Sequence, residues 1–330
     1  MSEKVYSLQA SDAANVAAQG AELTRDLVVR YASFIDAKPR TVEAYAKSIK
    51  PFFLFASRHG VTRLNEVTRP LVIAYREELK ERYKPTTVQM YITALRLFVR
   101  WAAQEGLMEN CADHLKGARL DREHKKDYLS AAQVRTLLGS IDRDTLGGKR
   151  DYAVLSLCAT CGLRTIEIVR ADVDDLRTLG GSSVLYVQGK GREERNEYVK
   201  VSPMVERVVR EYLAARGAKD GEPLFASLAH NHRGERLTTR AVSAMVKDTL
   251  KGCGFNSSRL TAHSLRHTAA TLALLAGKPL EEVQQFMRHS QITTTMIYNH
   301  ALDKARNSCA SALSAAIFGH EPEGERAVVA

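Results

Sequence analysis

The sequence has few cysteines, no long apolar run and no recognisable metal signature. Five cysteines, an odd and scattered number, cannot form a disulfide framework. Cys158 and Cys161 form one C-x-x-C without a second pair or a nearby histidine, so we interpret them as small helix residues. No apolar stretch approaches the roughly 18 residues of a membrane span, and the N-terminus lacks a signal-peptide pattern. These absences predict a protein of a reducing, aqueous compartment, the cytoplasm, with no membrane partner.

What the sequence does contain is a globular composition with a basic surplus. Its 330 residues are 45% hydrophobic and 26% charged, which excludes a disordered or fibrous chain and leaves room for about two domains. The 48 Lys and Arg residues outnumber the 38 Asp and Glu residues, for a net charge of +10. This surplus favours a polyanionic partner, nucleic acid before a membrane surface, although many basic proteins are merely soluble.

The N-terminal part predicts a helical bundle. Residues 1–24 are polar and alanine-rich, and we expect a flexible lead-in. Apolar residues then recur at helical spacing over residues 25–116, which predicts about four helices. In one of them Thr41 is the expected N-cap and Gly60 the expected C-terminal stop.

Two of these predicted helices begin alike, with Lys38-Pro39-Arg40-Thr41 and Lys84-Pro85-Thr86-Thr87. A cation, a hydroxyl and free backbone N–H groups at the positive end of a helix suit a phosphate group. Proline and threonine are also good helix starters, but this does not explain a lysine twice, because cations are disfavoured there. We therefore predict that six residues of these starts contact DNA: Lys38, Arg40, Thr41, Lys84, Thr86 and Thr87.

The second half predicts a separate domain. The charged segment 117–129 is nearly free of core residues and is typical of an exposed, mobile linker. The domain at 130–318 opens on the capping-box pattern Ser130-x-x-Gln133, and 319–330 form a tail. Strands at 183–187 and 197–201 flank a turn at Gly189-Lys190-Gly191. Helices are predicted near 131–140, 149–160, 203–216, 239–251, 264–276, 279–288, 292–299 and 302–318. The expected fold class is mainly α with a small antiparallel sheet (α+β).

Six residues with phosphate or proton-transfer chemistry stand at the ends of these predicted elements. They are Arg164, Lys190, His263, Arg266, His289 and Tyr298. Arginine binds phosphate oxygens bidentately and neutralises charge that grows in a phosphoryl transition state. Histidine and lysine transfer protons, and a tyrosine becomes a nucleophile when cations or a base activate it. Each residue alone is a weak signal, but the ordered set fits metal-free transesterification of a phosphodiester.

The motifs around these residues resemble the signature boxes of the tyrosine recombinase (phage integrase) family. The segment CGLRTIE at 161–167 is similar to the first box, and Gly189-Lys190-Gly191 to the lysine hairpin. The segment TAHSLRHTAAT at 261–271 is similar to the second box. The segment from Arg288 to Tyr298 is similar to the end of that box. The N-terminal bundle is similar to the core-binding domain of the family. The resemblance covers roughly residues 25–318.

The resemblance implies a role for each residue. Arg164 and Arg266 would bind the scissile phosphate, and Tyr298 would form a 3′-phosphotyrosyl bond. The proton-transfer and hydrogen-bonding groups would be His263 as general base, His289 as donor to the phosphate, and Lys190 as acid for the leaving 5′-oxygen. Glu167 would brace its neighbours. The family uses neither metal nor cofactor for this chemistry. It usually has Leu-Gly-His where this chain has Met287-Arg288-His289, which puts the local turn in doubt.

The implied function is site-specific DNA recombination, for the integration or excision of a mobile element or the resolution of DNA. The implied partners are double-stranded DNA with paired half-sites, a homotetramer on two duplexes, and an accessory directionality factor; bound enzyme would associate with the nucleoid. The other readings are a catalytically silent DNA-binding relative and a type IB topoisomerase-like strand relaxer, against which the complete residue set and the terminal helix argue.

Two further segments carry expectations about partners. The helix that starts at Thr238-Thr239-Arg240 resembles the family helix that enters the major groove, with Arg240 as a DNA contact; an ordinary capped surface helix explains it equally well. The apolar segment 310–318 is expected to dock on a neighbouring protomer, the alternative being that it folds back on its own domain.

Overall fold

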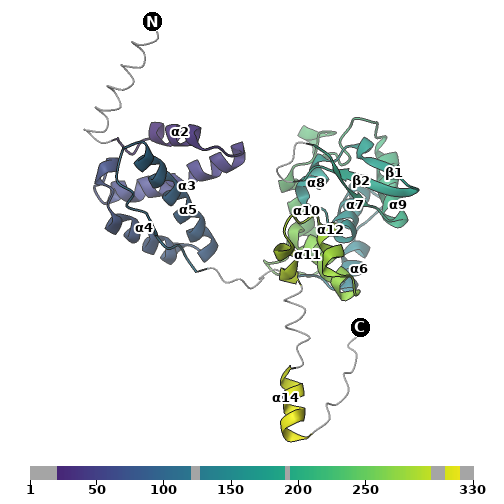
Figure 1. The fold of residues 1–330 in the computed structure, drawn as a ribbon. Coiled ribbons are helices and arrows are strands. Elements are labelled where there is room, and N and C mark those ends of the chain that lie inside the picture. Colours follow the sequence, from purple (N-terminus) through teal and green to yellow (C-terminus); the bar gives the residue numbers. More distant parts are fainter. Residues whose placement is uncertain (1–20, 120–126, 190–193, 299–308, 320–330) are drawn as a thin grey trace. The chain divides into compact units, whose positions relative to one another are not determined.

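The chain folds into two compact units, residues 1–122 and 123–330, and each is described by itself. The computed structural model describes residues 21–119, 127–189, 194–298 and 309–319 (Figure 1). The boundary between the units falls inside the segment 117–129, which the sequence predicts as a linker. No helix of the described residues is long and apolar enough to cross a membrane.

Over residues 21–119 the first unit is a bundle of four helices around an aromatic core, as the sequence predicts. The helices are α2 (Arg25–Phe34), α3 (Pro39–Arg58), α4 (Arg69–Arg82) and α5 (Pro85–Gln104), with a short 3-10 turn η1 at Leu64–Glu66. Phe98 lies at the centre of the core, with ring centroids 5.3 Å from Tyr31 and 5.7 Å from Trp101. Large aromatic side chains bury more apolar surface than any others, so this cluster dominates the stability of the unit.

Helices α3 and α5 both begin at a proline, with Lys38 and Lys84 as their N-caps. The prediction that Thr41 caps the first of them is therefore wrong: Thr41 lies inside the first turn. Proline needs no hydrogen-bond partner for its nitrogen and has its φ already fixed, so the helix starts there. The predicted stop at Gly60 is confirmed, since α3 ends at Arg58 and Gly60 has a φ of 74°.

The second unit is mostly helical with one small antiparallel sheet, which confirms the predicted fold class. Its helices are α6 (Ala131–Gly139), α7 (Leu146–Cys161), α8 (Thr165–Arg170), α9 (Pro203–Arg216), α10 (Thr239–Gly252), α11 (Ala262–Leu275), α12 (Leu280–Met287) and α14 (Cys309–Phe318). Residues 292–298 are also helical. Two short 3-10 turns, η2 (Val173–Asp175) and η3 (His230–His232), lie between them. The start of the predicted helix 302–318 lies outside the described residues.

The sheet has the order β1-β2-β3 (Leu176–Leu179, Ser182–Val187 and Glu197–Lys200) and places Tyr186 opposite Tyr198. Strand β1 was not predicted. Its residues are mostly exposed and it lacks the apolar alternation that marks β2, so only pairing with β2 defines it. The capping box of Ser130 and Gln133 at the start of α6 is confirmed.

Helix α7 forms the centre of the second unit and is buried along most of its length. It packs against α9 and α11. Cys158 and Cys161 lie in it among core residues, and burial raises the pKa of the Cys158 thiol to about 12. A protonated, enclosed thiol is inert, which agrees with their interpretation as helix residues. Among the described residues, no group of His, Cys, Asp and Glu side chains is arranged to hold a metal ion.

Leu129 corrects the description of residues 117–129 as nearly free of core residues. Its side chain is 1% exposed and belongs to the core of the second unit. Its backbone N–H donates to Thr268 Oγ1 of α11 at 3.0 Å. The sequence could not show this, because one leucine at the end of a charged segment has no periodic pattern around it.

We expect Leu129→Ala to lower the free energy of unfolding of the second unit by about 2–5 kcal/mol, because it removes buried methyl groups and leaves a cavity. The matched control is Tyr128→Ala, since Tyr128 is exposed and its replacement should change stability by less than about 0.5 kcal/mol. Denaturant unfolding of both variants measures the difference. Equal effects would show that Leu129 has no special place in the core.

Candidate active site

The site begins at the end of α7, where the chain turns sharply into α8. Gly162 ends α7 with a left-handed φ of 57°, and a Cβ there would lie 2.9 Å from Met287 Sδ. Glycine is therefore required both by conformation and by space. Arg164 follows as the N-cap of α8, and its side-chain Nη1 donates to Glu167 Oε1 at 2.7 Å. Its backbone N–H donates to Glu167 Oε2 at 2.8 Å, so one carboxylate fixes both ends of Arg164.

Arg266 lies in the second turn of α11 and is only 1% exposed. Its guanidinium donates to the backbone carbonyls of Gly162 and Met287, so it joins the end of α7 to the end of α12. Burial, together with the charges of Arg164 and Arg288, lowers the pKa of Arg266 to about 9. It is therefore still a cation at neutral pH.

Arg288 resolves the doubt about the missing glycine. The turn is preserved: Arg288 ends α12 in the left-handed conformation (φ 52°, ψ 48°) that a glycine would adopt more easily. Its side chain turns inward, and Nη2 lies 2.8 Å from Glu167 Oε2. Burial alone would raise the pKa of Glu167, but Arg288, the backbone N–H of Arg164 and the charges of Arg164 and Arg266 outweigh it and hold that pKa below its usual range.

His289 and Tyr298 lie together beside these arginines. The ring of His289 is stacked on that of Tyr298, with centroids 6.2 Å apart and an interplanar angle of 15°. His289 Nδ1 lies 2.9 Å from Thr295 Oγ1, one turn before Tyr298. Tyr298 is 5% exposed and also meets the edge of His267 at 5.0 Å. Tyr298 therefore lies in the site formed by its own chain.

His263 reaches this group through His267, one helical turn further along α11, with ring centroids 4.7 Å apart. His263 itself is exposed at the start of the helix. His267 was not predicted as a site residue. Its spacing of four residues from His263 was the available signal, because such residues share one face of a helix.

Burial holds both His289 and Tyr298 in their neutral forms, and the arginines add to this effect at His289 only. Burial first, and then the charges of Arg266 and Arg164, lower the pKa of His289 to about 4. Burial raises the pKa of Tyr298, and the same two arginines work against this rise. At neutral pH the site therefore contains a neutral imidazole and a protonated phenol.

Lys190 lies outside the described residues, but both flanks of its segment are anchored. Before it, Arg170 Nη1 donates to the carbonyl of Gly189 at 3.2 Å. After it, Arg195 Nη1 donates to Asp175 Oδ2 at 2.7 Å, and its Nη2 bonds Asp172.

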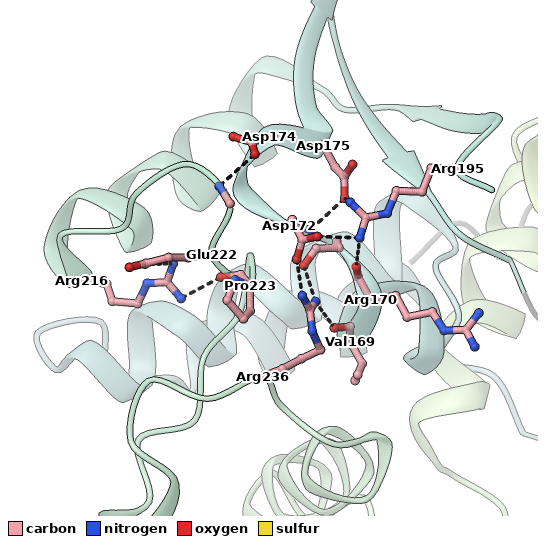
Figure 2. A network of polar contacts seen from close by, with 12 residues as sticks. Val169, Arg170, Asp172, Asp174, Asp175, Arg195, Arg216, Glu222, Pro223 and Arg236 are labelled. Carbon is pink, nitrogen blue, oxygen red and sulfur yellow. Dashed lines mark hydrogen bonds and ion pairs between the residues drawn. The ribbon is translucent and has the colours of Figure 1, made fainter. Parts of the chain in front are cut away.

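Figure 2 shows this second network, in which Asp172 lies between two arginines. The second of them is Arg236, which also donates to the carbonyls of Val169 and Ala171 at 2.8 and 3.1 Å. Arg195 adds a bond to the carbonyl of Arg170 at 3.0 Å. The network ties the segment after α8 to the start of β3. It was missed because its members are far apart in sequence and each looks like an ordinary surface charge.

The predicted DNA contacts are at the starts of three helices: α3 and α5 of the first unit and α10 of the second. Lys38, Arg40, Thr41, Lys84 and Thr86 are exposed at the starts of α3 and α5, and Thr87 is half-buried. Arg240 is exposed in the first turn of α10, where Thr238 Oγ1 accepts from the N–H of Ala241 at 3.1 Å.

A cleft of about 570 Å³ opens beside Arg288 and His289. Strand β3 and the residue before it form one wall, and the end of α12 and the turn after it form the other. The lining residues are Asn196, Glu197, Tyr198, Gln284, Gln285, Arg288, His289 and Ser290. The lining combines the cation of Arg288 with the carboxylate of Glu197, amides and hydroxyl groups, so the cleft suits a polar ligand.

Both halves of the chain match known protein families. Residues 127–305 match the model of the phage integrase family, and residues 34–106 match the phage integrase N-terminal SAM-like domain. Among curated relatives, tyrosine recombinase XerC of Herpetosiphon aurantiacus is 32% identical over 268 residues, which cover 79% of this chain and 84% of the relative. XerC of Caldanaerobacter subterraneus subsp. tengcongensis is 29% identical over 304 residues, covering 83% and 82%.

Two solved structures have the same fold. One is the XerH site-specific recombinase bound to a palindromic difH substrate, with a TM-score of 0.67, 20% identity, and coverage of 86% of this chain and 82% of that one. The other is a lambda integrase dimer bound to a COC′ core site, with a TM-score of 0.67, 18% identity, and coverage of 86% and 79%. The chain belongs to the phage integrase family of tyrosine recombinases. Its activity is site-specific recombination of DNA.

The lowered pKa of His289 predicts a pH dependence of stability. Between pH 6.5 and about 4 the unfolded chain binds the proton at His289 before the folded protein does, so acid in this window favours unfolding. The contribution is complete above pH 6.5 and is lost as the pH falls towards 4. We expect His289→Gln to show a smaller fall in melting temperature across this window than the parent. The exposed His230→Gln is the control. Identical slopes for all three proteins would contradict the lowered pKa.

Proposed function

We propose that this recombinase cleaves and rejoins DNA through a 3′-phosphotyrosyl bond at Tyr298. The observation that carries the proposal is that four residues far apart in sequence come together. Arg164 and Arg266 lie at the buried carboxylate of Glu167. His289 and Tyr298 stack on each other and lie within the electrostatic reach of the same two arginines. In this proposal the core-binding domain is residues 25–116, the linker 117–129 and the catalytic domain 130–318.

The reaction is an exchange of phosphodiesters. Tyr298 Oη attacks the scissile phosphorus as its proton passes to His263, and the 5′-oxygen leaves with a proton from Lys190. The bond from phosphorus to Tyr298 replaces the bond to the 5′-oxygen, so its energy is conserved. Attack by a 5′-hydroxyl of another strand reverses these transfers and releases Tyr298.

The arginines supply the electrostatic part of catalysis. Three guanidinium groups, Arg164, Arg266 and Arg288, face one carboxylate, so the site keeps a positive surplus for a phosphate whose charge grows in the transition state. His289 fits the role of hydrogen-bond donor in its neutral form. Nδ1 is 2.9 Å from the hydroxyl of Thr295, which can either donate or accept. In the tautomer in which Nδ1 accepts, Nε2 carries the proton and would donate it to a phosphate oxygen.

We expect Tyr298→Phe to abolish the covalent protein–DNA adduct, because it removes the attacking oxygen and little else. A suicide substrate with a nick beside the cleavage position traps the adduct, which denaturing gels detect. The matched control, Tyr128→Phe, alters an exposed tyrosine and should leave the adduct unchanged. An adduct that persists in Tyr298→Phe would mean that another residue is the nucleophile.

The helix starts of the first unit support a second part of the proposal, contact with DNA phosphates. Lys38 and Lys84 occupy the N-caps of α3 and α5, so each cation stands where the first backbone N–H groups of its helix point outward. Arg40, Thr41, Thr86 and Thr87 complete the two starts, and Arg240 at the start of α10 is proposed to contact DNA from the second unit.

We expect replacement of Lys38 and Lys84 by Ala to weaken binding to all DNA sequences alike. Each lost phosphate contact should reduce the slope of log K against log salt by about 0.9. Fluorescence anisotropy over a salt series measures this. The control is Lys80→Ala, because Lys80 lies on α4 and already pairs with Glu77 at 3.0 Å. A slope that does not change in the double variant would rule out these contacts.

Helix α14 supports the proposed assembly of a homotetramer on two duplexes with paired half-sites. Its large apolar residues Leu313, Ile317 and Phe318 are exposed, at 61%, 70% and 71%. Leu313 and Ile317 are one turn apart, so they share a face of the helix. We propose that a second copy of the chain covers this face, that an accessory factor sets directionality, and that the assembly works on DNA in the cytoplasm and nucleoid.

We expect a chain truncated after residue 306 to bind a single half-site as the full chain does, but to lose cooperative pairing of half-sites and complete recombination. Native gels with one and two half-sites separate these steps. Loss of half-site binding as well would favour a terminal helix that folds back on its own domain. Normal synapsis by the truncated chain would refute the proposed docking.

A further inference from the structure

Arg288 combines two unfavourable features in one residue. It adopts a left-handed backbone conformation, in which a side chain is strained and a glycine is not. Its side chain is 5% exposed, and among the described residues nothing accepts a hydrogen bond from its Nε. A buried donor without a partner is costly. A glycine would avoid both costs, so the guanidinium must do something that a glycine cannot.

The contacts of Arg288 bridge two turns of the active site. Nη1 donates to the carbonyl of Phe286 at 2.8 Å, within its own turn. Nη2 donates to Glu167 Oε2 at 2.8 Å and lies 3.4 Å from the carbonyl of Gly162, in the turn between α7 and α8. The planar guanidinium makes these contacts in different directions at once, which the single ammonium of a lysine cannot reproduce.

These contacts close a ring with Arg164. Glu167 divides its carboxylate between the two arginines, with Oε1 on Arg164 Nη1 and Oε2 on Arg288 Nη2. Arg164 Nη2 returns to the backbone carbonyl of Arg288 at 3.4 Å. Arg266 shares the carbonyl of Gly162 with Arg288. Without the Arg288 side chain, Arg164 is the one residue among those described that still hydrogen-bonds Glu167. Oε2 then keeps only the backbone N–H of Arg164, so the carboxylate is held from one side only.

We propose that Arg288 is a positioning residue of the recombination reaction. Its guanidinium fixes Glu167 and, through Glu167, holds Arg164 in the orientation that binds the scissile phosphate. The inference rests on the proposed function for the role of Arg164, and it assigns to Arg288 a task that the proposed mechanism does not need by itself. Arg288 and the following His289 both line the cleft, so the fixed turn also sets where the imidazole stands.

The test compares Arg288→Gly with the parent, in the full chain with duplex DNA. The glycine relieves the strain and the unpaired donor, but it also removes one buried ion pair of Glu167, whose other partner Arg164 remains. We expect these effects largely to offset each other, so that the melting temperature changes little. Affinity for a half-site should stay within about threefold, because most binding comes from backbone contacts elsewhere. The single-turnover rate of adduct formation at saturating DNA should fall at least about tenfold, because Arg164 is no longer held in place.

Two further variants separate positioning from general support. Arg288→Lys keeps the charge and loses the planar fork, and its rate should lie between those of the parent and Arg288→Gly. Glu282→Ala, on the exposed side of α12, should leave the rate unchanged. In an Arg164→Lys background, Arg288→Gly should slow the reaction little further, because residues that act through one group are not additive.

Each outcome bears on the inference. A rate for Arg288→Gly within twofold of the parent overturns the inference. An additive loss of rate in the Arg164→Lys background also overturns it, because it would mean that Arg288 acts on DNA directly. A melting temperature that falls together with the rate, without rescue by lysine, reduces Arg288 to structural support and also overturns it. Failure of the parent itself to form the adduct would instead refute the proposed function.

Discussion

The carboxylate of Glu167 is the interaction on which the site depends. It is fully buried, and three guanidinium groups gather around it. Cations at such short range repel one another strongly where water is excluded, so they stay together only with an anion between them. One carboxylate cannot balance three cations. The carboxylate therefore holds the arginines together but leaves a net positive charge, which in the proposed mechanism a phosphate diester would neutralise.

The fold serves this arrangement by bringing helix ends together. Helix α7, the buried centre of the second unit, ends at Gly162 directly beside the last residue of α12. Arg266 crosses from α11 to bond the carbonyls at both ends. Carbonyls at helix C-termini lack partners within their own helix, and here they accept from an arginine. The same bonds thus complete the helices and orient the guanidinium of Arg266, so stability and function are coupled at this point.

The sequence predicted most of the helices, although not the short α8, and the motifs that hold the proposed site residues, because both depend on local patterns. The periodicity of α5 and the capping box at Ser130 are local, and so are the boxes that contain Arg164 and Arg266. It missed what depends on contacts distant in sequence: strand β1, the burial of Leu129, and the network around Asp172. It recognised Arg288 only as a departure from a glycine. That the side chain turns inward to Glu167, 121 residues away, follows from packing and has no local signature.

Burial and charge also determine the protonation states of His289 and Tyr298 in the protein without DNA. Burial and the arginines keep His289 unprotonated, and burial keeps Tyr298 a phenol although it lies within its own chain's site. A phosphate placed among the arginines would offset the charges that oppose protonation of His289 and would bring the scissile phosphorus to Tyr298. In the proposed reaction, the negative charge that develops when Tyr298 loses its proton moves to the phosphate oxygens as the phenol oxygen attacks. Arg164 and Arg266 would stabilise that charge in the transition state. In the proposed mechanism Tyr298 therefore becomes reactive only when DNA is bound, which would protect the tyrosine in the free protein.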